Sequence, residues 1–349
     1  MESLKVKANG RGYTIDFVDN YTSIGEFVGA AGYKKCAIIT DENVDKLYAD
    51  EIMSILQAYQ PFKMVFPAGE ATKNPQNLIA GVRWLANNNF SRTDLVIALG
   101  GGVVGDLAGF IAATYDRGVD FIQVPTTIVA QCDSSIGGKV AVDIPEGKNR
   151  FGAFYPPKYV CINASVLQTL PERNRADGMA EVIKHGCIYD AKLFDDLSRG
   201  IDDFGAIVRR NCQIKQHFVE ADEYDRGLRM QLNFGHTLAH SIESYYGNDG
   251  EKFTHGEAVA VGMAVMARIG ERLGVTEGGT YEKIVDVLKK YRLPYKTDVP
   301  IAELIGYMKG DKKVMGGVIN VIMLEKIGSA FVRQLKIDEV GEFYDNYSA

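Results

Sequence analysis

The chain has 349 residues, of which 46% are hydrophobic and 24% charged, so it is long enough for two domains with ample cores. Its net charge of −6 argues against a nucleic-acid partner held by bulk electrostatics. No basic-then-apolar leader opens the chain, and the longest uncharged apolar run of its C-terminal half, between Glu257 and Arg268, is too short to span a bilayer. We expect a soluble cytoplasmic protein with no nucleic-acid or membrane partner.

Short strands and helices alternate along the first half of the chain. Strands are predicted at residues 13–18, 36–40 and 62–66, and helices at residues 44–59 and 75–87. The stretch 95–113, LVIALGGGVVGDLAGFIAA, then runs from a continuous apolar strand through three glycines into a helix. This alternation predicts an α/β domain with a buried, parallel, Rossmann-like sheet.

The three glycines at 100–102 would let the backbone approach a phosphate, and the helix N-terminus that follows offers unpaired amides. The segment therefore predicts a pyrophosphate site, although its spacing is not GxGxxG and a glycine turn without a ligand is the alternative. Polar residues also follow two strands: Asp41 and Asn43 in one case, Thr126 and Thr127 in the other. These are typical positions for ligand contacts.

A stretch rich in polar and small residues follows the strand at 121, up to residue 157. We interpret it as a functional loop in which Asp133, Lys139, Lys148 and Asn149 cluster. Two lysines there suit a phosphate, and ordinary solvated lysines are the alternative.

The prolines between 156 and 171 indicate a domain boundary, and we divide the chain into domains at residues 1–165 and 166–349. From Asp177, predicted to be an N-cap, helical spacing dominates to about residue 310, including a helix at 204–221 that carries Lys215. A β-hairpin is predicted at 318–335.

Helical spacing places Glu181, Lys184 and His185 on one face of a helix. Because Glu181 lies among apolar residues, it needs a partner. That partner is either a metal ion or, through a helix salt bridge, Lys184 or His185.

Three of the five histidines fall between residues 236 and 255, and the five scattered cysteines form no Cys-x-x-Cys pair. His236 and His240 share a helix face, and a glycine-rich turn can bring His255 toward them. Two imidazoles and a carboxylate make a typical open zinc site, whereas a polar surface helix is the alternative. Arg229 lies seven residues before His236, on the same side if the helix is continuous, where it could clamp a carboxylate.

Seven stretches form a specific combination between about residues 36 and 330: GGGVVGD, VPTTIVAQCDSSIGGKVAVD, GKNRFGAFYPP, LPERNRADGMAEVIKHG, GLRMQLNFGHTLAHSIE, HGEAVAVGM and DKK. Together they resemble the 3-dehydroquinate synthase family of the shikimate pathway. The resemblance implies a homodimer with an N-terminal NAD-binding α/β domain and a C-terminal all-helical domain that carries the metal, Zn²⁺ or Co²⁺.

The family's site residues are carried over by position. The implied metal ligands are Glu181, His236 and His255. The implied NAD contacts are Asp41, Asn43, Glu70, Lys73, Gly101, Gly102, Val103, Val104, Gly105, Asp106, Thr126, Thr127, Lys139, Lys148, Val166, Leu167, Gln168 and Thr169. The implied substrate and catalytic contacts are Asp133, Lys139, Asn149, Lys184, Lys215, Arg229, Asn233, His240 and Lys312 (or Lys313), with Arg117 reaching the neighbouring subunit's substrate.

The resemblance implies conversion of 3-deoxy-D-arabino-heptulosonate 7-phosphate to 3-dehydroquinate and inorganic phosphate. The steps are transient oxidation at C5 by NAD, phosphate elimination, re-reduction, ring opening and an intramolecular aldol reaction. His185 and Asp225 depart from the family pattern, in which tyrosine and glutamate are expected.

Three alternatives remain. A related sugar phosphate cyclase, such as 2-deoxy-scyllo-inosose synthase, acts on a sugar without a carboxylate and has no use for Arg229. A metal-dependent polyol dehydrogenase would not need the lysines and Arg229 together. An inactive NAD-binding module would not keep every ligand and cation position filled.

Overall fold

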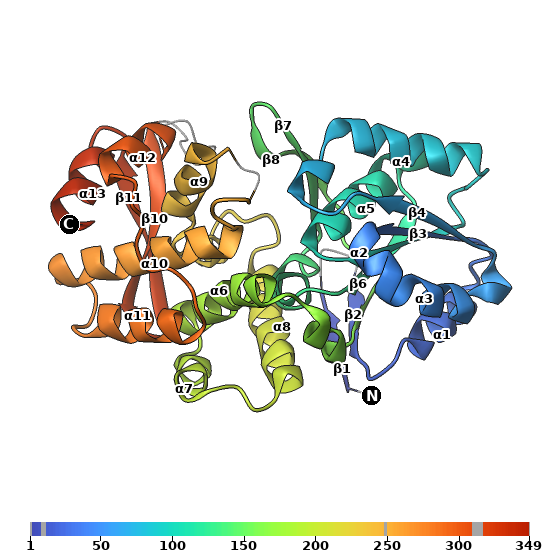
Figure 1. The fold of residues 1–349 in the computed structure, drawn as a ribbon, viewed down its shortest axis with the longest axis horizontal. Coiled ribbons are helices and arrows are strands. Elements are labelled where there is room, and N and C mark those ends of the chain that lie inside the picture. Colours follow the sequence, from blue (N-terminus) through green and yellow to red (C-terminus); the bar gives the residue numbers. More distant parts are fainter. Residues whose placement is uncertain (1, 8–11, 248–249, 309–316, 349) are drawn as a thin grey trace. The chain divides into compact units, whose positions relative to one another are not determined.

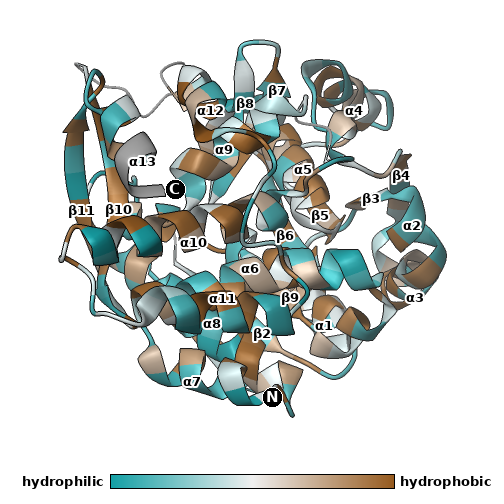
Figure 2. Ribbon diagram, turned by 60° about the vertical axis from the view of Figure 1, so that its left-hand side comes forward, coloured by the Kyte–Doolittle hydropathy of each residue, from teal (hydrophilic) through white to brown (hydrophobic). Residues whose placement is uncertain are grey.

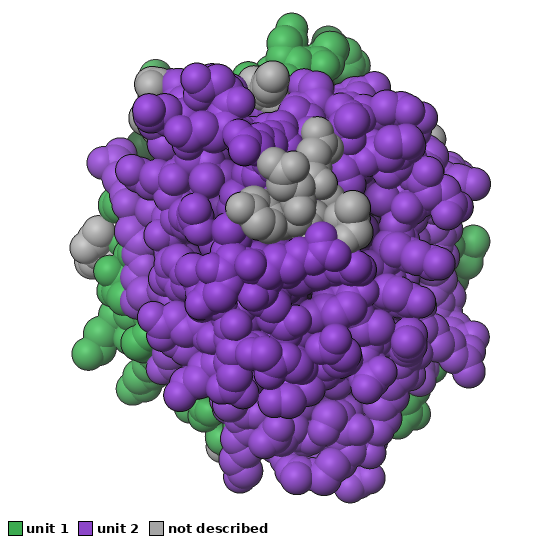
Figure 3. Space-filling view, turned by 90° about the vertical axis from the view of Figure 1, so that its left-hand side faces the viewer, with its two compact units in different colours: residues 1–170, 208–224 green, residues 171–207, 225–349 purple. Residues whose placement is uncertain are grey.

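The computed structural model describes residues 2–7, 12–247, 250–308 and 317–348 (Figure 1). Two compact units make up the chain, coloured separately in Figure 3. Unit 1 consists of residues 1–170 and 208–224, and unit 2 of residues 171–207 and 225–349. The assignment of separate functions to residues 1–165 and 166–349 stays a prediction.

Unit 1 contains a seven-stranded sheet in the order β1-β2-β9-β6-β5-β3-β4. Its strands are β1 (Glu2–Val6), β2 (Tyr13–Phe17), β3 (Cys36–Asp41), β4 (Pro61–Phe66), β5 (Leu95–Gly100), β6 (Asp120–Pro125) and β9 (Tyr159–Ile162). All neighbouring pairs are parallel except β1 with β2. The predicted parallel α/β architecture is therefore confirmed.

Helices cover both faces of this sheet. They are α1 (Thr22–Ala31), α2 (Glu42–Val44), α3 (Asp50–Ile55), α4 (Pro75–Asn87) and α5 (Gly102–Thr114). In Figure 1, α4 and α5 lie on one side of β3 and β4, and α1 and α3 on the other. Successive residues of β3 divide between two cores, with Ile39 packed among residues of α4 and α5 and Ile38 among those of α1 and α3. Because both faces are buried, the central strands β3 and β5 consist mostly of apolar residues.

The segment that we interpreted as a loop is instead largely a β-hairpin. β7 (Lys139–Ile144) pairs with β8 (Gly147–Phe154), and a short helical turn at Ala130–Ser134 precedes it. Val140 and Val142 of β7 are buried in the core under α5, and this packing selects strand over loop. Lys139 therefore lies at one end of the hairpin and Lys148 near its turn.

Unit 2 is mainly helical. Its elements are α6 (Glu172–Ile188), α7 (Ala191–Arg199), α9 (His236–Tyr245), α10 (His255–Arg272), α11 (Thr280–Lys290), α12 (Ile301–Met308), the hairpin β10 (Val318–Lys326) and β11 (Ser329–Lys336), and α13 (Val340–Ser348). In Figure 2, α10 carries several brown, hydrophobic residues, and most of this helix is buried. The helix α8 (Phe204–Ala221) begins in unit 2 and continues into unit 1, and it confirms the predicted helix at 204–221.

One prediction about unit 2 was wrong, and the condition attached to a second is not met. Asp177 does not begin a helix, because α6 starts at Glu172 and Asp177 lies within it. The segment before His236 is not continuous with α9 either: Leu228–Asn233 form a 3-10 helix, and Gly235 adopts a φ of 80°. A left-handed residue at the N-cap ends any helical continuity, so the two-turn spacing of Arg229 and His236 does not apply.

Among the described residues, no helix is long and apolar enough to cross a lipid bilayer. All five cysteines are buried and free. Burial raises the pKa of Cys36 to about 12 and that of Cys161 to about 11.

Candidate metal centre and nucleotide site

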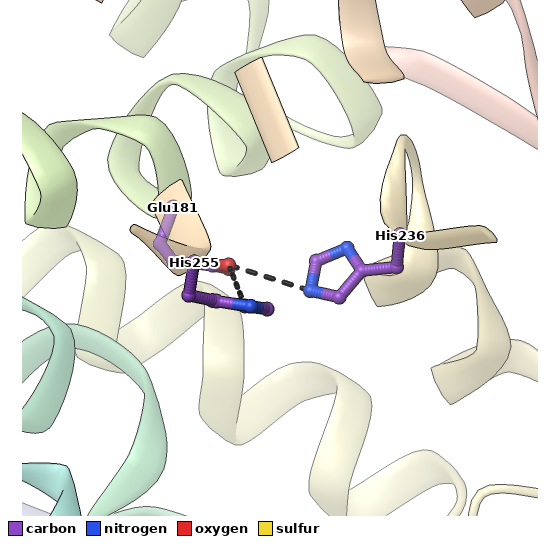
Figure 4. Close-up of side chains that lie close together, drawn as sticks. All are labelled: Glu181, His236 and His255. Atoms are coloured by element: carbon purple, nitrogen blue, oxygen red, sulfur yellow. Dashed lines mark ion pairs between the residues drawn. The ribbon is translucent and has the colours of Figure 1, made fainter. Parts of the chain in front are cut away.

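Three side chains from separate helices converge in unit 2 (Figure 4). Glu181 comes from α6, while His236 and His255 are the first residues of α9 and α10. The Nε2 atoms of both histidines lie 3.4 Å from Oε1 of Glu181. One ligand atom from each residue lies within 4.8 Å of the others, which is a suitable cluster for one metal ion.

Glycines allow the two histidine-bearing helices to approach each other. A Cβ on Gly235 would lie 2.8 Å from the carbonyl oxygen of Val259, and one on Gly262 would lie 2.0 Å from that of Gly235. Neither position has room for a side chain. At the start of α10, Thr254 and Glu257 form a capping box that fixes where the helix begins. Close packing and capping together hold His255 near His236.

The charges around Glu181 keep it ready to act as a ligand. Glu181 and Lys184 are both 2% exposed and form an ion pair through Oε2 of Glu181. Although burial opposes the charge, the ammonium group of Lys184 holds the pKa of Glu181 well below its usual range. Burial and the nearby Lys184 lower the pKa of His236 to about 3, so its imidazole is neutral. Of the alternatives left open by the sequence, the Lys184 salt bridge does form, and it leaves Oε1 facing the imidazoles.

Both imidazoles have their other nitrogen next to an acceptor. Nδ1 of His236 lies 3.2 Å from the carbonyl oxygen of Phe234, and Nδ1 of His255 lies 3.3 Å from Oε2 of Glu243. Metal-binding histidines characteristically donate one N–H to such an acceptor and use the other nitrogen for the ion. The arrangement therefore fits a divalent cation bound through the two Nε2 atoms and a carboxylate oxygen.

The predicted substrate residues of unit 2 lie on α6, α9 and the 3-10 helix. The ring of His240 has its centroid 5.8 Å from that of His236 and 6.4 Å from that of His255. Arg229 is a cation buried to 1% exposure. Nδ2 of Asn233 donates to the carbonyl oxygen of Met230, which orients its amide. Lys312 and Lys313 lie outside the described residues.

In unit 1, the predicted nucleotide contacts follow the carboxyl ends of parallel strands. Asp41 ends β3, Gly100 ends β5 with Gly101 and Gly102 directly after it, Thr126 follows β6, and the turn at Ala164–Thr169 follows β9. β3 and β5 are neighbours in the sheet, but β4, which lies between them in sequence, is on the outer side of β3. The chain thus reverses direction across the sheet between β3 and β5. Such a switch point is where open α/β sheets bind ligands.

The backbone at this switch point is tightly packed. A Cβ on Gly101 would lie 2.9 Å from Cγ2 of Thr127, and one on Gly105 would lie 2.6 Å from Oε1 of Gln123. Gly101 is the N-cap of α5 and supplies no side-chain cap. The first amides of α5 are consequently open to an anion, as a phosphate site requires.

Charged and hydroxyl side chains surround the same strand ends. Lys73, which is 5% exposed, has its Nζ atom 2.8 Å from Oδ2 of Asp106 and 3.6 Å from Oε1 of Glu70. Burial raises the pKa of Asp106 even though Lys73 opposes the shift. The hydroxyl of Thr126 is buried and has no hydrogen-bond partner within the described part of the chain. Asp41 has a local role as well, because its Oδ1 accepts from the amide of Asn43.

Further predicted substrate residues also lie in unit 1. Nζ of Lys215, on α8, is 2.6 Å from Oδ1 of Asp133. Lys139 and Asn149 are exposed on the β7–β8 hairpin, where Asn149 has a φ of 55°. Arg117 is exposed with a φ of 67°. The structure therefore pairs Lys215 with Asp133 but does not gather Lys139 and Lys148 at one end of the hairpin.

Sequence reasoning missed two acidic residues near the metal ligands. Glu243 was not singled out, although it follows His236 by seven residues on a helix, a spacing that returns it to the same face. The carboxylate of Asp177 accepts from the amide of Gly256 in α10. No local pattern indicates that second contact, because its partner lies 79 residues away.

Comparison with known proteins agrees with the predicted family. Residues 63–177 match the model of the 3-dehydroquinate synthase N-terminal domain, and residues 178–314 match that of the C-terminal domain. A 3-dehydroquinate synthase of Clostridium acetobutylicum is 42% identical over 98% of this chain and 99% of its own length. One of Clostridium beijerinckii is 45% identical over 87% of this chain and 89% of its own length.

Similar folds occur among solved structures. The structure of 2-deoxy-scyllo-inosose synthase complexed with carbaglucose-6-phosphate, NAD⁺ and Co²⁺ has a TM-score of 0.87 and 23% identity, covering 99% of this chain and 100% of that one. ValA, a 2-epi-5-epi-valiolone synthase from Streptomyces hygroscopicus subsp. jinggangensis 5008 with NAD⁺ and Zn²⁺ bound, has a TM-score of 0.82 and 24% identity, covering 95% of each chain. At these identities the likeness shows the fold. With the family models and the curated relatives in agreement, this chain belongs to the 3-dehydroquinate synthase family.

Proposed function

We propose that the chain is a 3-dehydroquinate synthase, a carbon–oxygen lyase of the shikimate pathway that acts on a phosphate. It converts 3-deoxy-D-arabino-heptulosonate 7-phosphate to 3-dehydroquinate and inorganic phosphate. The main support for this function is the convergence of Glu181, His236 and His255 in a chain that is 42% identical to such a synthase over nearly its whole length. The cofactors are NAD and a divalent metal, zinc or cobalt.

In this proposal Glu181, His236 and His255 hold the metal. The donor set of two imidazoles and one carboxylate is typical of catalytic zinc sites, in which a further position stays open for a substrate oxygen. When bound, the metal supplies Lewis acidity to the hydroxyls of the substrate. Lys184 holds Glu181 ionised, which keeps the ligand set anionic.

The switch-point edge of unit 1 is proposed to bind NAD. The open amides of α5 would receive the pyrophosphate, and the buried Thr126 hydroxyl offers an unused hydrogen-bonding group. Bound there, NAD would supply reversible hydride transfer with the substrate within one turnover. Because no reduced cofactor is released, only a catalytic amount of NAD is needed.

The cations are proposed to bind the two anionic ends of the substrate. Lys215 and Arg229 take the carboxylate, for which a buried guanidinium is suited by its bidentate geometry. Lys139, Asn149 and Lys312 take the phosphate. This division explains how a chain of net charge −6 can bind a substrate with two anionic groups.

Proton transfer is proposed to involve Lys184 and His240. Lys184 is buried next to Glu181, and the His240 ring lies beside both histidine ligands. Both side chains therefore lie near the hydroxyls of a substrate held at the cluster. A positioned side chain of suitable pKa can move a proton to or from such a hydroxyl.

Two finer assignments complete the proposal. The protein acts in the cytoplasm as a homodimer, and Arg117, which is exposed, contacts the substrate of the neighbouring subunit. The functional division places NAD binding in residues 1–165 and metal and substrate binding mainly in residues 166–349.

One assay tests the proposed function. Release of inorganic phosphate from the heptulosonate phosphate is measured with NAD far below the substrate concentration, and with glucose 6-phosphate as a parallel substrate. We expect many phosphates per NAD, no accumulation of NADH, and no turnover of glucose 6-phosphate, which has no carboxylate for Arg229. Turnover of glucose 6-phosphate alone would favour the 2-deoxy-scyllo-inosose synthase alternative, and stoichiometric NADH would favour a dehydrogenase.

A further inference from the structure

The imidazole of His255 is placed between two carboxylates. Its Nε2 atom lies 3.4 Å from Oε1 of Glu181, and its Nδ1 atom lies 3.3 Å from Oε2 of Glu243. Glu243 is 4% exposed although it is acidic. Burying a carboxylate is unfavourable unless it is paired. The contact with His255 is therefore an interaction inside the protein and not a chance meeting of two surface charges.

The tautomer of a metal-bound His255 explains this contact. A ring that binds a cation through Nε2 carries its proton on Nδ1, and here the Nδ1–H would donate to Glu243. A carboxylate acceptor both fixes the ring plane and makes Nε2 a stronger electron donor. His236 differs, since its Nδ1 faces the neutral carbonyl group of Phe234.

A second carboxylate holds the backbone of the same ligand. Oδ1 of Asp177 accepts from the amide of Gly256, the residue after His255, at 2.6 Å. The two helices touch there, because a Cβ on Gly256 would lie 2.0 Å from the carbonyl oxygen of Asp177. Asp177 also precedes Glu181 by one turn of α6, so the same helix supplies a metal ligand and anchors another.

The contact between α6 and α10 continues for one more turn. Arg173, four residues before Asp177, binds both carboxylate oxygens of Glu257 at 2.9 and 2.8 Å. Successive turns of α6 therefore contact successive residues of α10 in reverse order, ending with Glu181 at His255. Such a series fixes the position of the His255 backbone relative to Glu181.

We propose that Glu243 and Asp177 are positioning residues for the metal ligand His255, with Glu243 orienting its ring and Asp177 its backbone. The proposal rests on the proposed metal binding by Glu181, His236 and His255. Neither carboxylate binds the ion itself. Without either one, His255 must be ordered when the ion binds, and the affinity falls.

The test measures Zn²⁺ affinity of the metal-free protein by competition with a chromophoric chelator. Glu243→Gln keeps the shape and an acceptor oxygen but removes the charge, whereas Glu243→Met removes both. We expect the Zn²⁺ dissociation constant to rise about 10-fold in the first variant and about 100-fold in the second, the range typical of outer partners of metal ligands. The visible absorption of the Co²⁺-loaded protein should also shift in Glu243→Gln.

Asp177→Ala is compared with Asp190→Ala, a matched control. Both aspartates lie in unit 2 and accept from a backbone amide in the first turn of a helix, Asp190 from Leu193 of α7. Thermal melting of the metal-free proteins should show similar losses of stability. Only Asp177→Ala should weaken Zn²⁺ binding, by about 10-fold, because the helix that Asp177 contacts, α10, begins with the ligand His255, whereas α7 carries no ligand.

His255→Ala separates the two levels of the proposal. If His255→Ala loses Zn²⁺ affinity but both Glu243 variants and Asp177→Ala bind as tightly as the parent protein, the positioning roles are refuted and the metal site stands. If His255→Ala itself binds Zn²⁺ normally, the metal site fails. If Glu243→Met does not fold, the Zn²⁺ affinity of Glu243→Gln, which conserves the packing, tests the positioning role of Glu243 by itself.

Discussion

The two candidate sites differ in the groups that form them: side chains form the metal site, and mainly backbone forms the nucleotide site. The metal cluster of unit 2 consists of side chains from α6, α9 and α10. Each ligand contacts a neighbouring group: Glu181 contacts Lys184, His236 the carbonyl oxygen of Phe234, and His255 Glu243. The nucleotide edge of unit 1 is largely backbone, formed by strand ends, glycines and the open N-terminus of α5.

This difference predicts two kinds of response to change. Removing a ligand or the metal should abolish the chemistry while NAD still binds. Substitutions at the backbone edge should act by steric crowding. They should lower the affinity for NAD partially, according to the size of the added group, and leave the metal affinity unchanged.

Chelation should remove essentially all activity. The chemistry needs the Lewis acid that the cluster holds, and the protein supplies no substitute for it. Phosphate release is measured after treatment with a strong chelator and again after adding Zn²⁺ or Co²⁺, which should restore it. NAD affinity, followed in parallel, should not change. An enzyme that is indifferent to chelation would eliminate the metal site.

Arg229→Ala should lower kcat/KM for the heptulosonate phosphate by about 100-fold or more. Truncating one partner of a buried, hydrogen-bonded charge pair costs about 2–5 kcal/mol. The control is Arg226→Ala, three residues earlier and exposed, which should stay near parent activity. NAD affinity should be unchanged in both. Normal kinetics of Arg229→Ala would refute the assignment of the substrate carboxylate.

Gly101→Ala should lower the affinity for NAD about 10-fold and leave the affinity for Zn²⁺ unchanged. The added Cβ would lie 2.9 Å from Cγ2 of Thr127, a branched side chain whose hydroxyl accepts from the amide of Ala130, so it cannot simply move aside. Overpacking of this kind costs about 1–3 kcal/mol. Gly278→Ala is the control, since it would meet no atom within 4 Å. Equal NAD affinity in the two variants would contradict a packed backbone site.

Thr126→Val should produce the smallest effect. Its buried hydroxyl has no hydrogen-bond partner among the described residues, so removing it should not lower the stability of the NAD-free protein. NAD affinity should fall by a few fold, because a net hydrogen bond contributes about 0.5–1.5 kcal/mol. Thermal melting with and without NAD measures both quantities. A destabilised NAD-free variant with normal NAD affinity would show that the hydroxyl serves the fold instead.

Elements with local signals could be predicted from the sequence. The helix at 75–87 has the predicted bounds because Pro75 occupies its first turn and the Asn74 side chain caps it. The buried strands β3 and β5 were predicted from apolar runs ending in polar residues or glycine. The order of the strands was beyond reach, since it depends on long-range pairing.

Contacts between distant segments account for the errors and omissions. The sequence predicts a loop where the β7–β8 hairpin forms, because the strand character of this segment comes from packing under α5. Asp177 carries the chemistry of an N-cap but uses it on α10 and not on its own helix. The grouping of Glu181, His236 and His255 was predicted, whereas the supporting Glu243 was not.

The central claim is that one metal ion binds at Glu181, His236 and His255. Anomalous diffraction from crystals of the zinc-loaded protein tests it most directly. The account predicts one zinc at about 2.0–2.2 Å from Nε2 of both histidines and from a carboxylate oxygen of Glu181, with Nδ1 of His255 still beside Glu243. Zinc bound elsewhere, or bound through Nδ1 of either histidine, would contradict it.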